Sequence, residues 1–209
     1  MVEPDDALPG RDTPVVVTVP HRVLGTSMVA PFPEGSESVV VAMGCFWGAE
    51  RLFWELPGVI TTAAGYAGGF TPNPTHDEVG SGRTGHAESV LVVFDPDRVT
   101  RADVLRRFWE GHDPTQGYRQ GGDVGTQYRS MILASSDEQQ AAAAAGRTRY
   151  DEALAAAHFD PITTEVERGT TFFYADDAHQ QYLARDPEGY CGVEGTGVAL
   201  PGGREVAEG

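Results

Sequence analysis

The chain has 209 residues, 40% of them hydrophobic and 22% charged, which is the composition of a globular domain with a substantial core. Acidic residues outnumber basic residues 31 to 15, and the net charge of −16 opposes binding to nucleic acid or to anionic membrane surfaces. The sequence has no apolar run of membrane-spanning length and no signal-peptide pattern, so we expect a cytoplasmic protein whose two cysteines stay reduced.

The first 37 residues are predicted to form an irregular arm, because they hold six of the fourteen prolines. One short strand is expected within the arm, over Val15–Val19. The apolar run Val39–Met43 then has the length of a buried strand. A helix should follow over Phe46–Leu56 and end at Pro57-Gly58.

The middle of the chain alternates regular elements with two long polar loops. These loops, residues 65–85 and 111–129, have a length that is usual only where a loop carries function. The helix between them should be capped by Thr100, with Asp103 as its capping-box partner. The expected elements are strands over Val59–Ala64 and Ser89–Phe94 and a helix over Thr100–Trp109.

The last third continues in the same irregular alternation and contains no repeat. We expect one α/β or α+β domain around a single sheet, residues 38–203, between the arm and a flexible end at residues 204–209. The expected elements are a strand over Ser130–Ala134, an exposed helix over Asp137–His158, strands over Ile162–Glu167 and Thr171–Tyr174, and a helix over Ala178–Arg185.

Cys45 is the first candidate for chemistry, because it lies between an expected strand and an expected helix in GCFWG. Unpaired backbone N–H groups and the positive end of the helix dipole converge at that position and stabilise a thiolate. The pKa of Cys45 should therefore fall below the ordinary value of about 8.5. The alternative is a buried cysteine that acts as a small hydrophobic residue.

Cys191 is the second cysteine and lies in the glycine-rich segment GYCGVEGTG. Its backbone should be poorly constrained, and a mobile cysteine can reach a distant sulfur, as a resolving thiol must. The alternative is a packed cysteine without a role.

Five further residues lie where they could line a site. Glu88 stands at the rim of the first loop and could donate a proton if apolar walls raise its pKa, although most glutamates are surface residues. Tyr128 and Asp123 lie in the second loop. Phe46 and Trp47 are adjacent and cannot share a helix face, so one of them should meet a cavity or solvent.

Six motifs follow one another along the chain: GCFWGAERLFW, GYAGGFTPNPT, GHAESV, FWEGHDPTQGYRQGGDVGTQYRS, YADDAHQQYL and GYCG. In this order they resemble the A-type peptide methionine sulfoxide reductases, from about Val39 to Pro201. DALPGR at residues 6–11 is similar to the arm of longer bacterial members. The resemblance implies an α+β domain of the ferredoxin-like plait kind, with a mixed central sheet and flanking helices.

The resemblance also implies thiol-dependent reduction of methionine-S-sulfoxide, in proteins or as the free amino acid, without metal or organic cofactor. Cys45 would attack the sulfoxide sulfur and become a sulfenic acid. Cys191 would convert it to a disulfide that thioredoxin or a similar dithiol reduces. The protein would act as a monomer in the repair of oxidised proteins. The remaining implied roles are a proton donor (Glu88), a phenol on the sulfoxide oxygen (Tyr128), an acidic residue of the site (Asp123) and walls for the S-methyl group (Phe46, Trp47).

Two positions depart from the family pattern. Ala199 stands where many long bacterial relatives have a third cysteine, which excludes a second disulfide relay within this chain. His76 stands where relatives usually carry a tyrosine that binds the sulfoxide oxygen. An imidazole can also donate a hydrogen bond, but its reach and charge state differ.

Two other kinds of protein fit part of the pattern. One is a Cys–His acyl hydrolase with Cys45 as nucleophile and His86 as base. The other is an acidic binding module in which GCFWG belongs to the core. A metal site has weak support, because no pair of histidines has the spacing of a common metal motif.

Overall fold

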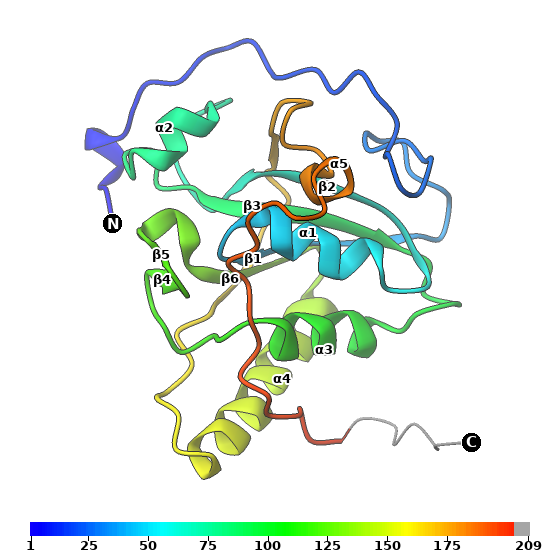
Figure 1. Ribbon diagram of the computed structural model, residues 1–209, viewed down its shortest axis with the longest axis vertical. Coiled ribbons are helices and arrows are strands. Elements are labelled where there is room, and N and C mark those ends of the chain that lie inside the picture. Colours follow the sequence, from blue (N-terminus) through cyan, green and yellow to red (C-terminus); the bar gives the residue numbers. More distant parts are fainter. Residues whose placement is uncertain (203–209) are drawn as a thin grey trace.

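The computed structural model describes residues 1–202 and is built around a six-stranded mixed sheet (Figure 1). The strand order is β7-β6-β1-β3-β2-β8, and every neighbouring pair is antiparallel except β6 and β7. The strands of this sheet are β1 (Glu37–Met43), β2 (Val59–Ala67), β3 (Ala87–Phe94), β6 (Ser130–Ala134), β7 (Glu165–Arg168) and β8 (Phe173–Tyr174). The expected α+β plait with a mixed sheet is confirmed.

Helices α1, α3 and α4 cover one face of the sheet and share its larger core (Figure 1). Within residues 1–202, no helix has the length and apolar content needed to cross a membrane. The helices are α1 (Phe46–Trp54), α2 (His76–Gly80), α3 (Arg101–Gly111), α4 (Asp137–Ala156) and α5 (Tyr182–Arg185), with short 3₁₀ turns η1 (Pro4–Asp6) and η2 (Thr126–Tyr128).

Both faces of the sheet are buried, which explains why β1 and β3 read as continuous apolar runs. Along β1, Val39 and Val41 point to the helices, whereas Val40 points to a second core on the opposite face. Residues of the N-terminal arm, Met28 among them, pack on that second core.

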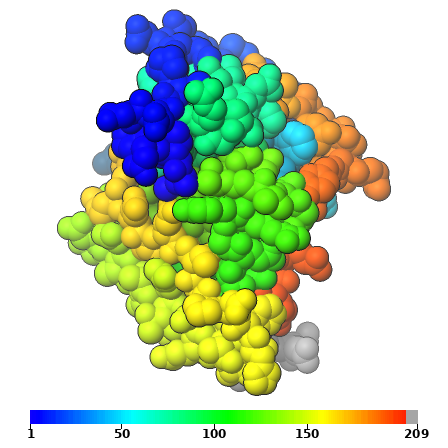
Figure 2. All heavy atoms as spheres, turned by 90° about the vertical axis from the view of Figure 1, so that its left-hand side faces the viewer, coloured from blue at the N-terminus to red at the C-terminus, as the bar shows by residue number. Residues whose placement is uncertain are grey.

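The arm also docks on the α2 region. Figure 2 shows its first residues lying against the segment around α2. Arg11 forms an ion pair of 2.8 Å with Glu78 of α2, and the Leu8 N–H donates to the Arg83 carbonyl at 3.0 Å. The strand expected over Val15–Val19 is wrong: this segment is irregular, and Val17 and Val19 pack on the face of the sheet instead of pairing at its edge.

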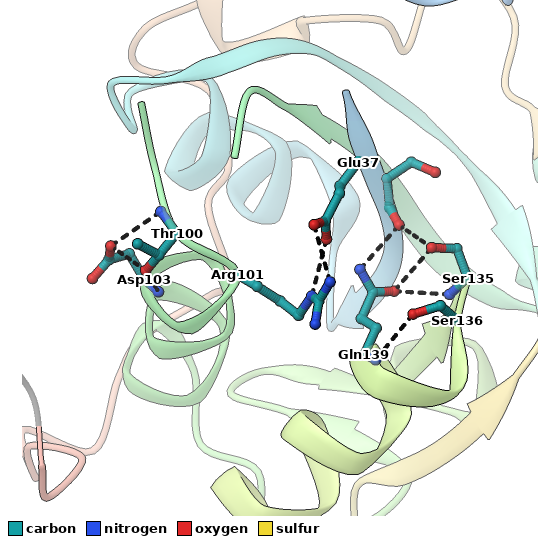
Figure 3. Close-up of polar contacts among 8 residues, drawn as sticks. Glu37, Thr100, Arg101, Asp103, Ser135, Ser136 and Gln139 are labelled. Atoms are coloured by element: carbon teal, nitrogen blue, oxygen red, sulfur yellow. Dashed lines mark hydrogen bonds and ion pairs between the residues drawn. The ribbon is translucent and has the colours of Figure 1, made fainter. Parts of the chain in front are cut away.

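Two helices begin as local chemistry dictates (Figure 3). The Thr100 hydroxyl accepts from the Asp103 N–H and the Asp103 carboxylate accepts from the Thr100 N–H, each at 3.2 Å, so the predicted capping box of α3 is confirmed. The Ser136 hydroxyl caps α4 by accepting from the Gln139 N–H at 3.1 Å. An Arg101–Glu37 ion pair with contacts of 2.9 and 3.0 Å ties α3 to β1.

The two predicted loops are more regular than expected. Strand β2 continues to Ala67 because it keeps pairing with β3, and helix α2 lies within the first loop, capped by a Thr75–Glu78 capping box. The second loop contains η2 and a two-stranded hairpin of β4 (Arg119–Gln120) and β5 (Asp123–Val124).

Several expected elements are shorter or less exposed in the structure. Helix α4 ends at Ala156 and buries Tyr150 and Leu154, so it is exposed on one side only. The expected helix from Ala178 begins at Tyr182, because Gln181 adopts a left-handed conformation (φ +46°) that interrupts it. Strands β7 and β8 begin three and two residues later than expected, and the predicted flexible end, residues 204–209, lies outside the described residues.

Candidate active site

A tight turn between β1 and α1 presents Cys45. Gly44 has φ +91°, and an added Cβ there would lie 2.5 Å from the Cβ of Gln120, so both conformation and space require glycine. Cys45 follows as the N-cap of α1 and is 6% exposed. Its side chain makes no capping hydrogen bond, which leaves the thiol available.

Glu88 comes from β3 to the same turn. Its carboxyl is 3% exposed and accepts a hydrogen bond of 3.0 Å from the Phe46 N–H, the first amide of α1. In the sheet Glu88 pairs with Tyr66 of β2, so extension of β2 and β3 beyond their expected ends positions it. A carboxyl 43 residues away along the chain therefore lies beside Cys45 at the helix N-terminus.

The thiol of Cys45 does not have the depressed pKa that its position predicts. Burial raises the pKa of Cys45 well above its ordinary range, and the nearby charges of Glu88 and Asp123 raise it further. Hydrogen bonds from the Trp47 and Gly48 backbone favour the thiolate but do not outweigh these effects. The expectation considered the helix terminus alone, whereas the fold buries the thiol beside acidic side chains.

Tyr128 and Asp123 approach the thiol from the second loop. Burial, followed by the charges of Glu88, Asp123 and Cys45, raises the pKa of Tyr128 to about 12. The phenol therefore stays protonated at neutral pH and can donate a hydrogen bond. The Asp123 carboxylate has one buried oxygen that accepts no hydrogen bond among the described residues. The η2 turn and the β4–β5 hairpin, absent from the predicted elements, hold these two side chains.

Aromatic rings enclose the other side of the turn. Phe46 is buried with its ring centroid 5.8 Å from that of Tyr66, whereas Trp47 is half-buried and stacks on Tyr182 at 4.0 Å. The indole N–H of Trp47 donates to Nδ1 of His179 at 3.3 Å. The two adjacent aromatics thus diverge as predicted, and only Phe46 joins the core.

His76 lies at the mouth of this aromatic group. Its Nε2 is 3.6 Å from Oε1 of Glu88, and its ring stacks on His179 with centroids 4.3 Å apart. The side chain is 37% exposed, so it stands between the buried carboxyl and solvent. A hydrogen bond to Glu88 raises the pKa of His76, against the opposing effect of burial.

Cys191 lies on the tail where the tail crosses the first turn of α1 (Figure 1). Both cysteines are free thiols, Cys45 buried and Cys191 exposed. The tail is better ordered than its glycine content predicts. Beyond Cys191, the Leu200 N–H donates to Glu110 at 2.7 Å, and the Tyr150 hydroxyl donates to the Val198 carbonyl at 3.0 Å.

Sequence reasoning assigned no role to three residues of this group: Tyr66, His179 and Tyr182. All three lie in the motifs GYAGG and YADDAHQQYL, but spacing along one chain does not show which side chains face Cys45. Tyr66 is the clearest omission, because its hydroxyl is buried without a hydrogen-bond partner among the described residues. Such a hydroxyl can donate to a bound molecule.

The rival pairing of Cys45 with His86 finds no support in the geometry. Both ring nitrogens of His86 are engaged by backbone: Nδ1 accepts from the Gly69 N–H at 3.1 Å, and Nε2 donates to the Thr71 carbonyl at 2.8 Å. Burial lowers the pKa of His86. Within residues 1–202, no three His, Cys, Asp or Glu side chains are grouped as metal ligands.

Comparisons with known proteins agree with this geometry. Residues 37–199 match the family described as peptide methionine sulfoxide reductase. "Peptide methionine sulfoxide reductase MsrA 1" of Caulobacter vibrioides is 57% identical over 206 residues, which is 99% of this chain and 95% of that protein. Among solved structures, methionine sulfoxide reductase A of Corynebacterium diphtheriae has a TM-score of 0.86 and 47% identity over 95% of this chain and 96% of that one. The reduced form of Mxr1 from Saccharomyces cerevisiae has a TM-score of 0.68 and 31% identity, covering 79% of this chain and 96% of that one.

Proposed function

The chain belongs to the peptide methionine sulfoxide reductase family and reduces methionine sulfoxide, and from that premise we propose how its own residues carry the reaction. Cys45 is the nucleophile that attacks the sulfur of the S epimer, in proteins or as the free amino acid. The observation that carries this proposal is the buried Glu88 carboxyl, held by the Phe46 amide in the helix turn that follows Cys45.

The first step requires proton transfer, and the two groups that exchange protons, the Cys45 thiol and the Glu88 carboxyl, lie close together. A sulfoxide oxygen leaves only after protonation, and the Glu88 carboxyl passes a proton to that oxygen. It receives the proton that Cys45 loses on attack. The oxygen and its hydrogen pass to Cys45 as a sulfenic acid, and methionine leaves with two electrons that the thiol sulfur has lost. The protonated phenol of Tyr128 donates a hydrogen bond to the oxygen during the transfer. The negative charge of Asp123 helps to raise the pKa of that phenol and so to keep it protonated.

Substrate selection rests on the aromatic group. The rings of Phe46 and Trp47 form apolar walls for the S-methyl group, and His76 offers an N–H at the mouth. Their apolar ring surfaces suit a small apolar substituent, while the donors face the oxygen.

Recycling uses the second cysteine. The Cys191 thiol condenses with the Cys45 sulfenic acid, which releases water and forms a Cys45–Cys191 disulfide. Thioredoxin or a similar dithiol then reduces this disulfide by thiol–disulfide exchange. The reductant becomes a disulfide, and Cys45 and Cys191 become free thiols again. We place this cycle in the cytoplasm, in a monomer whose catalytic unit is residues 38–203 and whose arm is residues 1–37.

The deciding experiment supplies the separated S and R epimers of a methionine sulfoxide peptide, with dithiothreitol as reductant. The S epimer alone should be reduced, and Cys45→Ser should reduce neither epimer. Reduction of the R epimer, or activity of Cys45→Ser above background, would refute the assignment. Hydrolysis of a thioester without consumption of dithiol would instead support the acyl-hydrolase alternative.

A further inference from the structure

Gly48, the last residue of GCFWG, lies under the sulfur of Cys191. An added Cβ at Gly48 would stand 2.7 Å from Cys191 Sγ and 3.1 and 3.2 Å from Cγ2 and Cβ of Val193. Real Cβ atoms are essentially never found within 3.0 Å of another heavy atom, so a side chain here would push Cys191 away. Among residues 1–202, and apart from the helix's own backbone, only the sulfur of the second cysteine lies so close to such a Cβ.

Backbone conformation does not explain this glycine. Gly48 lies within α1, in right-handed helical conformation, whereas Gly44 before the helix needs a positive φ. Glycine is among the poorest residues for a helix interior, and alanine is the best. A glycine kept at a cost to helix stability, and buried, points to a need for close approach by another group.

Position connects this contact to the reaction. Gly48 is three residues after Cys45, so both belong to the first turn of α1 and to one side of it. The tail is tied to α5 on one side of Cys191 and to α3 and α4 on the other. In this structure the sulfur of Cys191 therefore lies against the first turn of α1.

We propose that Gly48 leaves the space in which the resolving thiol lies. Because Gly48 has no side chain, Cys191 can lie one helical turn from Cys45, where the Cys191 thiol can attack the sulfenic acid. This inference rests on the proposed function and adds a positioning residue to its second step. In that step the Cys191 thiol loses its proton and the sulfenic acid loses its hydroxyl, so that one S–S bond and one water form. In the first step Gly48 contributes only its backbone N–H, which faces the Cys45 thiol and which Gly48→Ala keeps.

The test is Gly48→Ala, followed through a single turnover of the reduced protein with excess S-sulfoxide peptide and no reductant. Released methionine reports the first step, which also consumes the Cys45 thiol, and loss of the alkylatable Cys191 thiol reports the second. We expect one methionine per chain at the wild-type rate, while disulfide formation slows about tenfold or more, as misplacement of a reacting group by about 1 Å allows. Thermal unfolding checks the fold, and the midpoint should be unchanged or raised, because alanine favours the helix.

Gly80→Ala is the matched control, since an added Cβ at that helical glycine meets nothing within 4 Å, and it should leave both steps unchanged. In a Cys191→Ser background, Gly48→Ala should no longer change any rate, with a small thiol as reductant. Disulfide formation at the wild-type rate in Gly48→Ala would overturn the proposal, as would equal slowing of both steps. If wild-type chains release no methionine at all, the proposed function fails instead.

Discussion

At the scale of single residues, Cys45 and Glu88 lie at the same positive helix terminus. The amide of Phe46 binds the carboxyl of Glu88, while the amides of Trp47 and Gly48 face the thiol. A negative charge on Glu88 disfavours a second negative charge on the thiol, which is one cause of the raised pKa of Cys45. A resting thiol with a raised pKa is therefore compatible with catalysis, because the carboxyl that holds the pKa up also accepts the proton.

Replacement of Glu88 should separate its two contributions. Glu88→Ala removes the acid and should lower the rate by about 10²–10⁴. Glu88→Gln keeps an N–H donor for the sulfoxide oxygen and a carbonyl for the Phe46 amide, so its loss should be smaller. Steady-state reduction of the S epimer by dithiothreitol measures both, and equal losses would contradict a hydrogen-bonding role. Because Glu88→Gln also removes a charge that raises the thiol pKa, alkylation of Cys45 by iodoacetamide should shift to lower pH.

His76 should add one ionisation to the pH dependence of the rate. Its raised pKa comes first from the hydrogen bond to Glu88 and also from the charges of Asp77 and Asp176, against burial. The stacked ring of His179 remains neutral, because burial and the charge of His76 lower its pKa. His76 thus stays protonated above the ordinary histidine value of about 6.5, and activity that uses its charged form falls as pH rises through that higher pKa.

The variant that tests this is His76→Tyr, which removes the titrating imidazole and introduces the phenol that the resemblance leads us to expect at this position. We expect the variant to remain active and to lose the fall in rate that accompanies deprotonation of His76, because a phenol does not ionise between about pH 5 and 8. The measurement is kcat/KM for the S epimer across this range. Superimposable profiles of wild type and variant would place His76 outside the reaction.

At the scale of elements, a buried polar network joins α1, β2, the arm and the segment before α5. The Glu50 carboxylate accepts from the Thr62 hydroxyl at 3.0 Å and from the Gln181 backbone and side chain at 2.8 and 2.6 Å. Thr62 in turn receives a hydrogen bond of 2.8 Å from Nε2 of His21 in the arm. The network explains the left-handed backbone of Gln181, and so the short α5 that carries Tyr182 into the site.

Glu50→Gln should reveal the charge in this network through the pH dependence of stability. Burial raises the pKa of Glu50 to about 7, against the hydrogen bonds that favour the carboxylate. A pKa raised by folding gives a contribution that is complete below the unfolded value of about 4.5 and lost as pH rises through 7. The unfolding free energy of wild type relative to Glu50→Gln should therefore fall by about 3 kcal/mol from pH 4.5 to 7.5.

Urea unfolding at several pH values measures that difference. His21 and His112, whose pKa values burial lowers to about 4, are present in both proteins, so their contributions cancel. Parallel stability curves for the two proteins would show that folding does not raise the pKa of Glu50.

Elements whose signals are local were predicted well, and elements that depend on distant partners were not. The β6 strand and the capping box of α3 followed from their own residues. The end of β2 depends on β3, and the break at Gln181 depends on Glu50, so neither is visible in a local pattern. The signal for α2 was present, since Thr75 and Glu78 have capping-box spacing, but the surrounding glycines and prolines favoured a loop.

The same distinction applies to the candidate site. The motifs named Cys45, Glu88 and Tyr128 because the resemblance covers them residue by residue. The pKa of the thiol was predicted in the wrong direction, because a helix terminus is a local feature whereas burial and the approach of Glu88 are properties of the folded chain. Tyr66 was missed because its unpartnered hydroxyl is visible only in three dimensions.

At the scale of the whole molecule, the two ends of the chain close opposite sides of one sheet. The arm covers the second core, and the tail crosses the helices on the other face, where the Leu200 carbonyl accepts a hydrogen bond from Arg106 of α3 (Figure 1). The chain holds two cysteines, so a disulfide within one chain can only join Cys45 to Cys191. In the proposed cycle, the path of the tail therefore determines how Cys191 reaches the Cys45 sulfenic acid to form the disulfide.

Cys191→Ser should separate the two halves. The variant should still release one methionine per chain, because attack and departure of the oxygen need only Cys45 and its acid. It should then stall with thioredoxin, which exchanges with a disulfide, whereas a small thiol should sustain turnover by reducing the sulfenic acid directly. Mass spectrometry of the wild type after one turnover without reductant should find a Cys45–Cys191 disulfide and no free thiol. Normal cycling of Cys191→Ser with thioredoxin would mean that the reductant attacks Cys45 itself, and that the tail has no part in the redox chemistry.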